Sequence, residues 1–285
     1  MSRLTARLLN TVVNGAKPDV NLDLLLTHAG KNKILLHLLR ALNIQESVRE
    51  QQESGIRKVI EVVQTLSKLL KNYNYAFFKL IKPISYVPAD VDILIDESQA
   101  KKAAHEIMHY GYTIAVKDPY CITLTKGDSI IDLYVHPSLG GAILINGQRL
   151  LEYSCIMEFN GVEIKSLESY AEALVAASHA MYKERVYTLN DYFTVRDWAD
   201  ERTFQLAEEL KCKSALRLAI KLNEAISKGL VETPYKIPLR IWANLLIQKI
   251  LKDPQTRSTS KNLVVALGSK RGLKLLISKF MRESY

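Results

Sequence analysis

The spacing of apolar residues changes twice along this chain of 285 residues, and these changes limit the folds it can adopt. Up to about residue 74, apolar side chains recur every three to four residues, as on one face of an α-helix. Between residues 75 and 166, short runs rich in β-branched and aromatic residues predict strands. Helical spacing returns from residue 167. The order predicts an α+β fold, a small mixed β-sheet flanked by N-terminal and C-terminal helices.

The same patterns place the individual elements and three regions: an N-terminal helical region (1–74), an α/β core (75–166) and a C-terminal helical region (167–285). Helices are predicted at Met1 to Val13, Asn21 to Leu42 with a break at Gly30, Glu46 to Tyr73, Gln99 to Tyr110, Leu167 to Tyr182, Leu189 to Ala199, Thr203 to Leu210, Ser214 to Ser227, Pro238 to Leu251 and Gly272 to Met281. Strands are predicted at Tyr75 to Phe78, Val91 to Ile95, Tyr112 to Val116, Ile122 to Thr125 and Ile130 to Val135, with a strand pair around Ile156 to Ile164. Lys126 to Asp128 would form a hairpin turn, and Asp253 to Asn262, rich in Ser, Thr and charge, a mobile connection.

Composition excludes several classes of protein. Apolar residues make up 48% and charged residues 24% of the chain, which are ordinary globular values and argue against disorder. We expect no membrane span, because no apolar run approaches the roughly 20 residues that a bilayer requires. The N-terminus lacks the pattern of a secretory signal, and Cys121, Cys155 and Cys212 have neither disulfide-framework nor zinc-knuckle spacing. These features predict a reduced, cytoplasmic protein.

Three aspartates stand out on the predicted strands. Alternate residues of a strand face opposite sides, so Asp90 and Asp92 share one face while the apolar residues between and after them face the core. Asp132 lies in the same way on the strand Ile130 to Val135. If these two strands are neighbours, the three carboxylates converge on one side of the sheet.

Carboxylates this close repel one another, and a divalent cation resolves the conflict. A set of oxygen ligands without His or Cys favours Mg²⁺ or Mn²⁺ over zinc. Two such ions can polarise an α-phosphate and stabilise a leaving pyrophosphate, which is the two-metal chemistry of nucleotidyl transfer. The ordinary reading of a bare Asp-x-Asp pair, as turn chemistry at the start of a strand, stays open at this point.

The segment from Phe77 to Ile95, together with Asp132 in its apolar strand, resembles the nucleotidyltransferase superfamily typified by DNA polymerase β and the minimal nucleotidyltransferases. A longer stretch, roughly 21–198, is similar to a group of nucleotidyltransferase-like proteins with a helical region before the motif. The resemblance implies that Asp90 and Asp92 hold both metals, and that Asp132 completes the reactive metal and assists deprotonation of an acceptor hydroxyl. It implies a nucleoside triphosphate (NTP) as substrate.

The chain departs from the family where a Gly-Ser pair lets the triphosphate approach, because Leu80 and Ile81 stand there. Either Ser85 with Lys79 and Lys82 has taken over the phosphate contact, or efficient NTP binding has been lost. The second alternative describes a catalytically weak or inactive binding module that keeps the fold.

Two other patterns suggest different functions. The segment His105-Glu106-Ile107-Met108-His109 matches the His-Glu-x-x-His motif of zinc metallopeptidases, with Glu152 or Glu158 as the only evident third ligands. Because the helix is short, we rank a zinc metallopeptidase third among the candidate functions.

The net charge is +9, and from Arg202 onward Lys and Arg exceed Asp and Glu by about 11. The basic residues singled out are Lys211, Lys213, Arg217, Lys221, Lys270, Arg271 and Lys274, with Tyr235 and Trp242 between them. They suggest an RNA or DNA acceptor on the C-terminal helices, or a solvated face.

Two further histidines are interpreted as residues without a catalytic role, with His136 either at the rim of the site or in a structural position. His136 shares a strand face with Asp132 but lies about 13 Å further along. His179, on a predicted helix with apolar neighbours, is expected to be a buried, hydrogen-bonded histidine.

Overall fold

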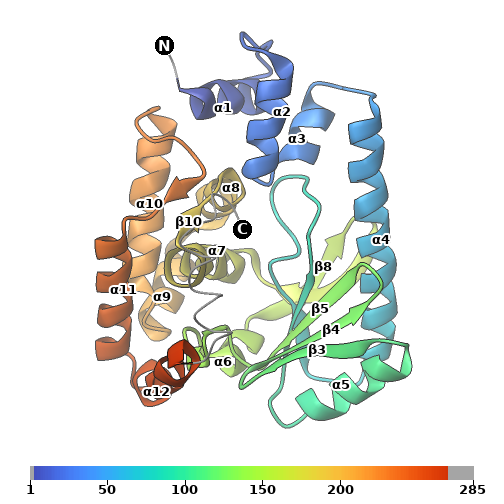
Figure 1. Cartoon of the computed structure of the whole chain (residues 1–285), viewed down its shortest axis with the longest axis vertical. Coiled ribbons are helices and arrows are strands. Elements are labelled where there is room, and N and C mark those ends of the chain that lie inside the picture. The colour runs from blue at the N-terminus through green and yellow to red at the C-terminus, as the bar shows by residue number, and fades with distance from the viewer. Residues whose placement is uncertain (1–2, 269–285) are drawn as a thin grey trace.

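The computed structural model describes residues 3–268 and shows a mixed α and β architecture (Figure 1). Within these residues the largest sheet has seven strands in the order β3-β4-β5-β2-β1-β9-β8. Their bounds are β1 (Tyr75–Phe77), β2 (Val91–Ile95), β3 (Thr113–Asp118), β4 (Cys121–Lys126), β5 (Ser129–Tyr134), β8 (Ser154–Phe159) and β9 (Val162–Leu167). The pairs β2–β5 and β1–β9 are parallel and the other neighbours antiparallel, so the sheet is mixed, as predicted.

Helices lie on both sides of this sheet (Figure 1). Those before it and inside it are α1 (Leu4–Asn14), α2 (Leu22–Lys31), α3 (Leu35–Ala41), α4 (Ser47–Leu69), α5 (Ala100–His109) and α6 (Gly147–Leu151). After it come α7 (Ser169–Ser178), the π-helix η1 (His179–Glu184), α8 (Leu189–Trp198), α9 (Glu201–Glu209), α10 (Lys213–Ser227), α11 (Leu239–Lys252) and α12 (Pro254–Gly268). Short strand pairs are β6 (Ser138–Leu139) with β7 (Ala142–Ile143) and β10 (Val186–Tyr187) with β11 (Tyr235–Lys236).

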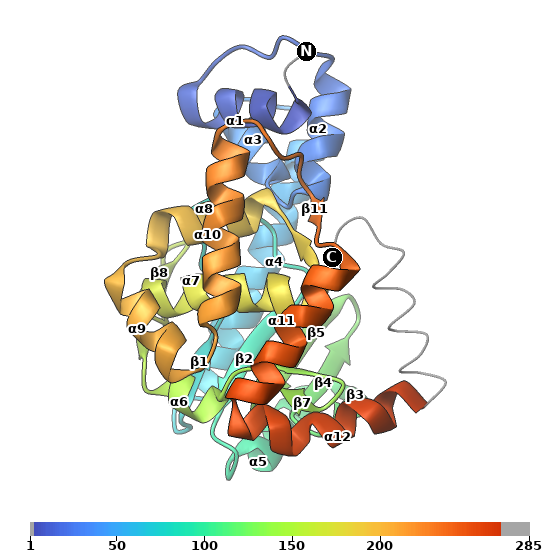
Figure 2. The ribbon, with the colours of Figure 1, turned by 90° about the vertical axis from the view of Figure 1, so that its left-hand side faces the viewer.

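The alternation of the central strand β2 divides the apolar core of the described residues between the two faces of the sheet. Val91, Ile93 and Ile95 pack with α4 and α5 in one cluster. Leu94 faces the other way and joins α7 to α10, together with residues of α1 and α2. The N-terminal helices and the C-terminal helices therefore share a core, and Figure 2 shows α10 reaching up to α1.

The predicted strands and most predicted helices are confirmed, with shifts of a few residues at their ends. The predicted break at Gly30 is wrong in position, because α2 continues to Lys31. The chain turns at Asn32, whose side-chain amide donates to the carbonyl of His28 at 3.0 Å and whose Oδ1 accepts from the backbone N–H of Leu189 at 3.0 Å. This contact with α8, distant in sequence, selects the position of the break.

The predicted mobile connection from Asp253 to Asn262 is also wrong, since it forms the first part of α12. Asp253 begins this helix by accepting hydrogen bonds from the N–H of Gln255 at 3.0 Å and the hydroxyl of Thr256 at 2.9 Å. Pro254 at the first helical position suits the fixed φ of proline. Thr256 and Thr259 then hydrogen-bond to Ile143 of β7. The polar residues of this segment thus make specific contacts. The last predicted helix, Gly272 to Met281, lies outside the described residues.

None of the helices in residues 3–268 is long and apolar enough to span a membrane.

Candidate metal centre

The three aspartates come together where β2 and β5 run side by side. Asp92 is directly opposite Asp132 in the parallel register, and Asp90 immediately precedes β2. One carboxylate oxygen from each lies within 4.8 Å of the other two. Asp92 is buried, with 4% of its surface exposed, while Asp90 and Asp132 are half-buried. The predicted convergence is confirmed, and among the described residues this is the one group of three or more carboxylate, His or Cys side chains close enough to share an ion.

Lys79 supplies a positive charge to this cluster from the loop after β1. Its ammonium lies 2.8 Å from Oδ1 of Asp92 and about 5 Å from the ring centres of Phe78 and Tyr134. Burial alone would lower the pKa of Lys79, but Asp92, Asp90 and Asp132 together raise it above its ordinary value. Lys79 therefore keeps its positive charge beside the aspartates.

One ammonium does not balance three carboxylates. The pKa of Asp92 is raised to about 7, chiefly by burial; Lys79 opposes the shift, and Asp90 and Asp132 add to it. Oδ1 of Asp92 is buried and, apart from the ion pair, has no well-directed hydrogen bond in the described structure. A buried carboxylate oxygen whose partner is a single ammonium, next to two further carboxylates, suits a hard divalent cation such as Mg²⁺ or Mn²⁺.

Asp132 is held by two hydroxyl groups. Thr123 on the neighbouring strand β4 donates to its Oδ1 at 2.6 Å, and Tyr134 donates to its Oδ2 at 3.2 Å. The tyrosine hydroxyl in turn accepts from the ammonium of Lys183 at 3.1 Å. These contacts fix the carboxylate while each oxygen keeps lone pairs for a further ligand.

The backbone of Lys79 is fixed from two sides. It has a left-handed conformation (φ 61°). Its N–H donates to Oε1 of Glu172 at 2.6 Å, and its carbonyl accepts from the hydroxyl of Tyr86. Glu172 on α7 is 1% exposed and also forms an ion pair with Lys82 at 3.4 Å. A carboxylate thus occupies a backbone donor of the loop that carries Lys79.

The aspartates open onto a cleft of about 460 Å³. Its cationic lining comes from three parts of the chain: Lys33 between α2 and α3, Lys79 and Lys82 in the loop after β1, and Lys183 on η1. Burial lowers the pKa of Lys33, against the opposing charges of Asp191, Asp90 and Glu184. The cleft therefore joins an acidic pole to a set of lysines.

Two residues lie in surroundings other than those that the sequence suggested. Ser85 does not line this cleft; it lines a neighbouring cavity of about 260 Å³ and accepts a hydrogen bond from Arg40 at 2.9 Å. Lys82 and Tyr86 line both cavities, whereas Ser85 lines the smaller one alone. His179 is not fully buried: it is half-buried in the cleft wall, with Nε2 3.5 Å from Glu184.

His136 is structural, as interpreted from the sequence. It is buried, and its Nδ1 accepts from the backbone N–H of Gly147 at 2.9 Å. Burial lowers its pKa, so the neutral ring is favoured.

The zinc-peptidase alternative loses support. His105 and His109 are exposed on α5 with their ring centres 4.4 Å apart. Glu106 accepts a hydrogen bond from Tyr73, and in residues 3–268 no third ligand joins the two histidines.

The basic residues singled out after Arg202 that the structure describes lie outside the cleft lining. Lys211, Arg217 and Lys221 are exposed, and Lys213 pairs with Glu208. Trp242 donates its indole N–H to the carbonyl of Tyr182 at 3.0 Å, so it is part of the packing. Lys270, Arg271 and Lys274 lie outside the described residues.

Sequence reasoning missed Lys33, Glu172 and Lys183. Glu172 left a signal, because it is an acid amid the apolar positions of a predicted helix. Lys33 and Lys183 left none, since ordinary surface lysines look the same in sequence. Lys183 reaches the cleft from η1, and π-helical turns often occur at functional sites.

Neither the scan against protein-family models nor the search of curated proteins gave a significant match to this chain.

Proposed function

We propose that this chain is a metal-dependent nucleotidyltransferase, which moves a nucleoside monophosphate from an NTP to an acceptor hydroxyl on a nucleic acid or protein. The observation that carries the proposal is the in-register pair of Asp92 and Asp132, with Asp90 beside them, at the floor of a lysine-lined cleft. Carboxylates alone would also suit structural cation binding, but the lysines add sites for a polyanionic substrate.

Each residue has a role consistent with its contacts. Asp90, Asp92 and Asp132 would hold Mg²⁺ or Mn²⁺, and when bound these ions polarise the α-phosphate and stabilise the leaving pyrophosphate. Thr123 and Tyr134 orient Asp132. Asp132 would assist deprotonation of the acceptor hydroxyl. Lys79, Lys82, Lys33 and Lys183 contribute positive charge for the triphosphate.

The test is incubation with each α-labelled NTP and Mg²⁺ or Mn²⁺, with and without RNA, followed by a search for label in protein and RNA. Asp92→Asn should reduce transfer by about 10³-fold or more, because charge stabilisation worth several kcal/mol is lost. Asp128→Asn is the matched control, since Asp128 is exposed in the turn between β4 and β5. Equal transfer by wild type and Asp92→Asn would refute the assignment.

A specific observation favours a second candidate, a binding module without transferase activity. Glu172 already occupies the backbone N–H of Lys79 and pairs with Lys82. This candidate predicts that the protein binds NTP or nucleic acid while wild type and Asp92→Asn are equally devoid of transfer.

For the acceptor we propose RNA or DNA lying across α10. Each lysine or arginine that neutralises a phosphate releases a counterion, so affinity should fall log-linearly with salt. Neutralising Lys211, Lys213, Arg217 and Lys221 together should weaken RNA binding and flatten this slope, with NTP binding unchanged. If wild type binds no RNA at low salt, the acceptor is a protein or small molecule.

A further inference from the structure

Lys79 occupies the position of a counter-ion in the aspartate cluster. Its ammonium touches Oδ1 of Asp92, the buried oxygen without a well-directed hydrogen bond, and it interacts electrostatically with Asp90 and Asp132 as well. A divalent cation shared by the three carboxylates would need the same oxygen-lined space. The ammonium and a divalent cation therefore compete.

The other cleft lysines are held differently. Lys82 pairs with Glu172 at 3.4 Å, and Lys183 donates to the hydroxyl of Tyr134 at 3.1 Å. Lys79, by contrast, lies 2.8 Å from Oδ1 of Asp92. Lys79 is thus the cleft lysine whose contact a bound cation would replace.

Only the side chain of Lys79 is free to respond. Its backbone N–H and carbonyl are engaged by Glu172 and Tyr86, so the loop stays in place when the ammonium moves. The cleft beside it provides about 460 Å³ into which a four-carbon side chain can turn. The faces of Phe78 and Tyr134 flank the ammonium in its present position.

We propose that Lys79 exchanges partners: its ammonium contacts Asp92 in the metal-free protein, and an incoming divalent cation displaces it into the cleft, where it binds a phosphate of the nucleotide. This inference rests on the proposed function. It couples the two ligands, because metal binding breaks the ion pair and a polyphosphate then supplies the displaced ammonium with a new partner. By linkage, each ligand strengthens binding of the other.

Lys79→Met therefore has two effects of opposite sign. The variant should bind Mn²⁺ alone about tenfold more tightly than wild type, because no ion pair has to be broken. It should bind magnesium tripolyphosphate at least about fivefold more weakly, because the displaced ammonium is gone. A purely structural role would move both affinities in the same direction.

Mn²⁺ binding is measured by electron paramagnetic resonance on metal-stripped protein, and tripolyphosphate binding by calorimetry at saturating Mg²⁺. Lys183→Met is the matched control: it removes one cleft charge without touching Asp92, and should tighten Mn²⁺ binding by less than threefold. Lys79→Met binding Mn²⁺ no more tightly than Lys183→Met would overturn the exchange. If neither wild type nor Lys79→Met binds Mn²⁺, the metal centre itself fails and the proposed function with it.

A second measurement uses the wild-type chain and does not depend on the variant folding. Amine acetylation, followed by mass spectrometry, reports the accessibility of each lysine with and without Mn²⁺. Lys79 should react several-fold faster with Mn²⁺, while Lys82 is unchanged. Mn²⁺ binding that leaves the reactivity of Lys79 as before would overturn the proposal.

Discussion

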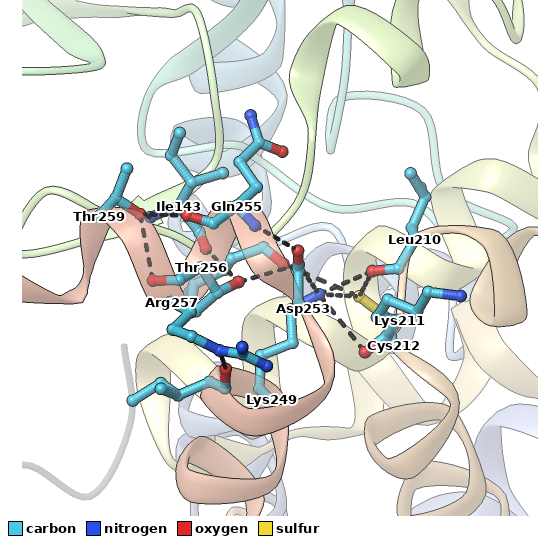
Figure 3. Close-up of polar contacts among 12 residues, drawn as sticks. Ile143, Leu210, Lys211, Cys212, Lys249, Asp253, Gln255, Thr256, Arg257 and Thr259 are labelled. Atoms are coloured by element: carbon cyan, nitrogen blue, oxygen red, sulfur yellow. Dashed lines mark hydrogen bonds and ion pairs between the residues drawn. The ribbon is translucent and has the colours of Figure 1, made fainter.

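Lys79 with Asp92 in the cleft, and Lys249 with Asp253 between α11 and α12, form two ion pairs of the same length, 2.8 Å. Their surroundings differ. Lys249 has no exposed side-chain surface and donates to the carbonyl of Leu210 at 2.6 Å, at the end of α9 (Figure 3). Asp253 accepts two further hydrogen bonds at the start of α12, whereas Oδ1 of Asp92 has no well-directed one.

The acidity of the two carboxyls follows these surroundings. Although burial works against it, Lys249 and the hydrogen bonds from residues of α12 lower the pKa of Asp253 below its ordinary value. The pKa of Asp92 is raised to about 7 in spite of Lys79. A buried ion pair whose hydrogen-bonding groups all have partners, such as Lys249 with Asp253, serves to join helices. A buried ion pair in which the carboxylate charge is only partly balanced, such as Lys79 with Asp92, is typical of functional sites.

The largest effect on stability is expected at the structural pair. Lys249→Met leaves Asp253 charged and buried and removes the donor for Leu210, so it should lower the free energy of unfolding by about 3–5 kcal/mol. Urea denaturation monitored by circular dichroism measures this. A loss below about 1 kcal/mol would show that the hydrogen bonds around Lys249 contribute little.

Replacing Asp92 is expected to raise the free energy of unfolding. The folded protein keeps the Asp92 proton up to about pH 7, while the unfolded chain releases it near its ordinary pKa of 3.8. Stability from this group is therefore complete below about pH 4 and is lost as the pH rises toward 7. Asp92→Asn should be more stable than wild type by about 1–3 kcal/mol at pH 8 in EDTA, with a smaller gain at pH 5. A gain that is independent of pH would contradict the assignment.

A smaller change is expected for Lys79→Met. Lys79 is the group that lowers the pKa of Asp92, so Asp92 holds its proton more firmly when the ammonium is lost, and the free energy of unfolding should fall by only about 1 kcal/mol at pH 7. The comparison with Lys249→Met in the same denaturation series isolates the difference between the pairs. Equal losses in the two variants would mean that Lys79 is as structural as Lys249.

How far the sequence predicts this molecule depends on the range of each interaction. Strand alternation is a local property, so the positions of Asp90, Asp92 and Asp132 on one face followed from parity once β2 and β5 were neighbours. The side of the loop to which Ser85 points depends on Arg40, and the helix after Asp253 depends on Lys249 and β7. Such contacts between distant segments leave no local pattern.

The contribution of Lys33, Glu172 and Lys183 to the cleft was hidden for the same reason. Lys33 reaches the aspartates because Asn32 connects the end of α2 to the start of α8, a contact across 157 residues of sequence. Glu172 meets the loop after β1 across 93 residues. The aspartates could be predicted because the alternation of side chains is a local property of a strand. The lysines could not, because they lie on elements that only tertiary packing brings together.

The most direct test is the change in melting temperature on adding Mn²⁺ to metal-free wild type, Asp92→Asn and Asp253→Asn. A ligand at about 100 times its Kd stabilises the folded state by about 2.7 kcal/mol. Wild type and Asp253→Asn should both gain several degrees, the latter from a lower starting point, because its cleft is intact. Asp92→Asn should start higher and gain nothing. A gain in Asp92→Asn equal to that of wild type would contradict the account, because the cation would then bind elsewhere.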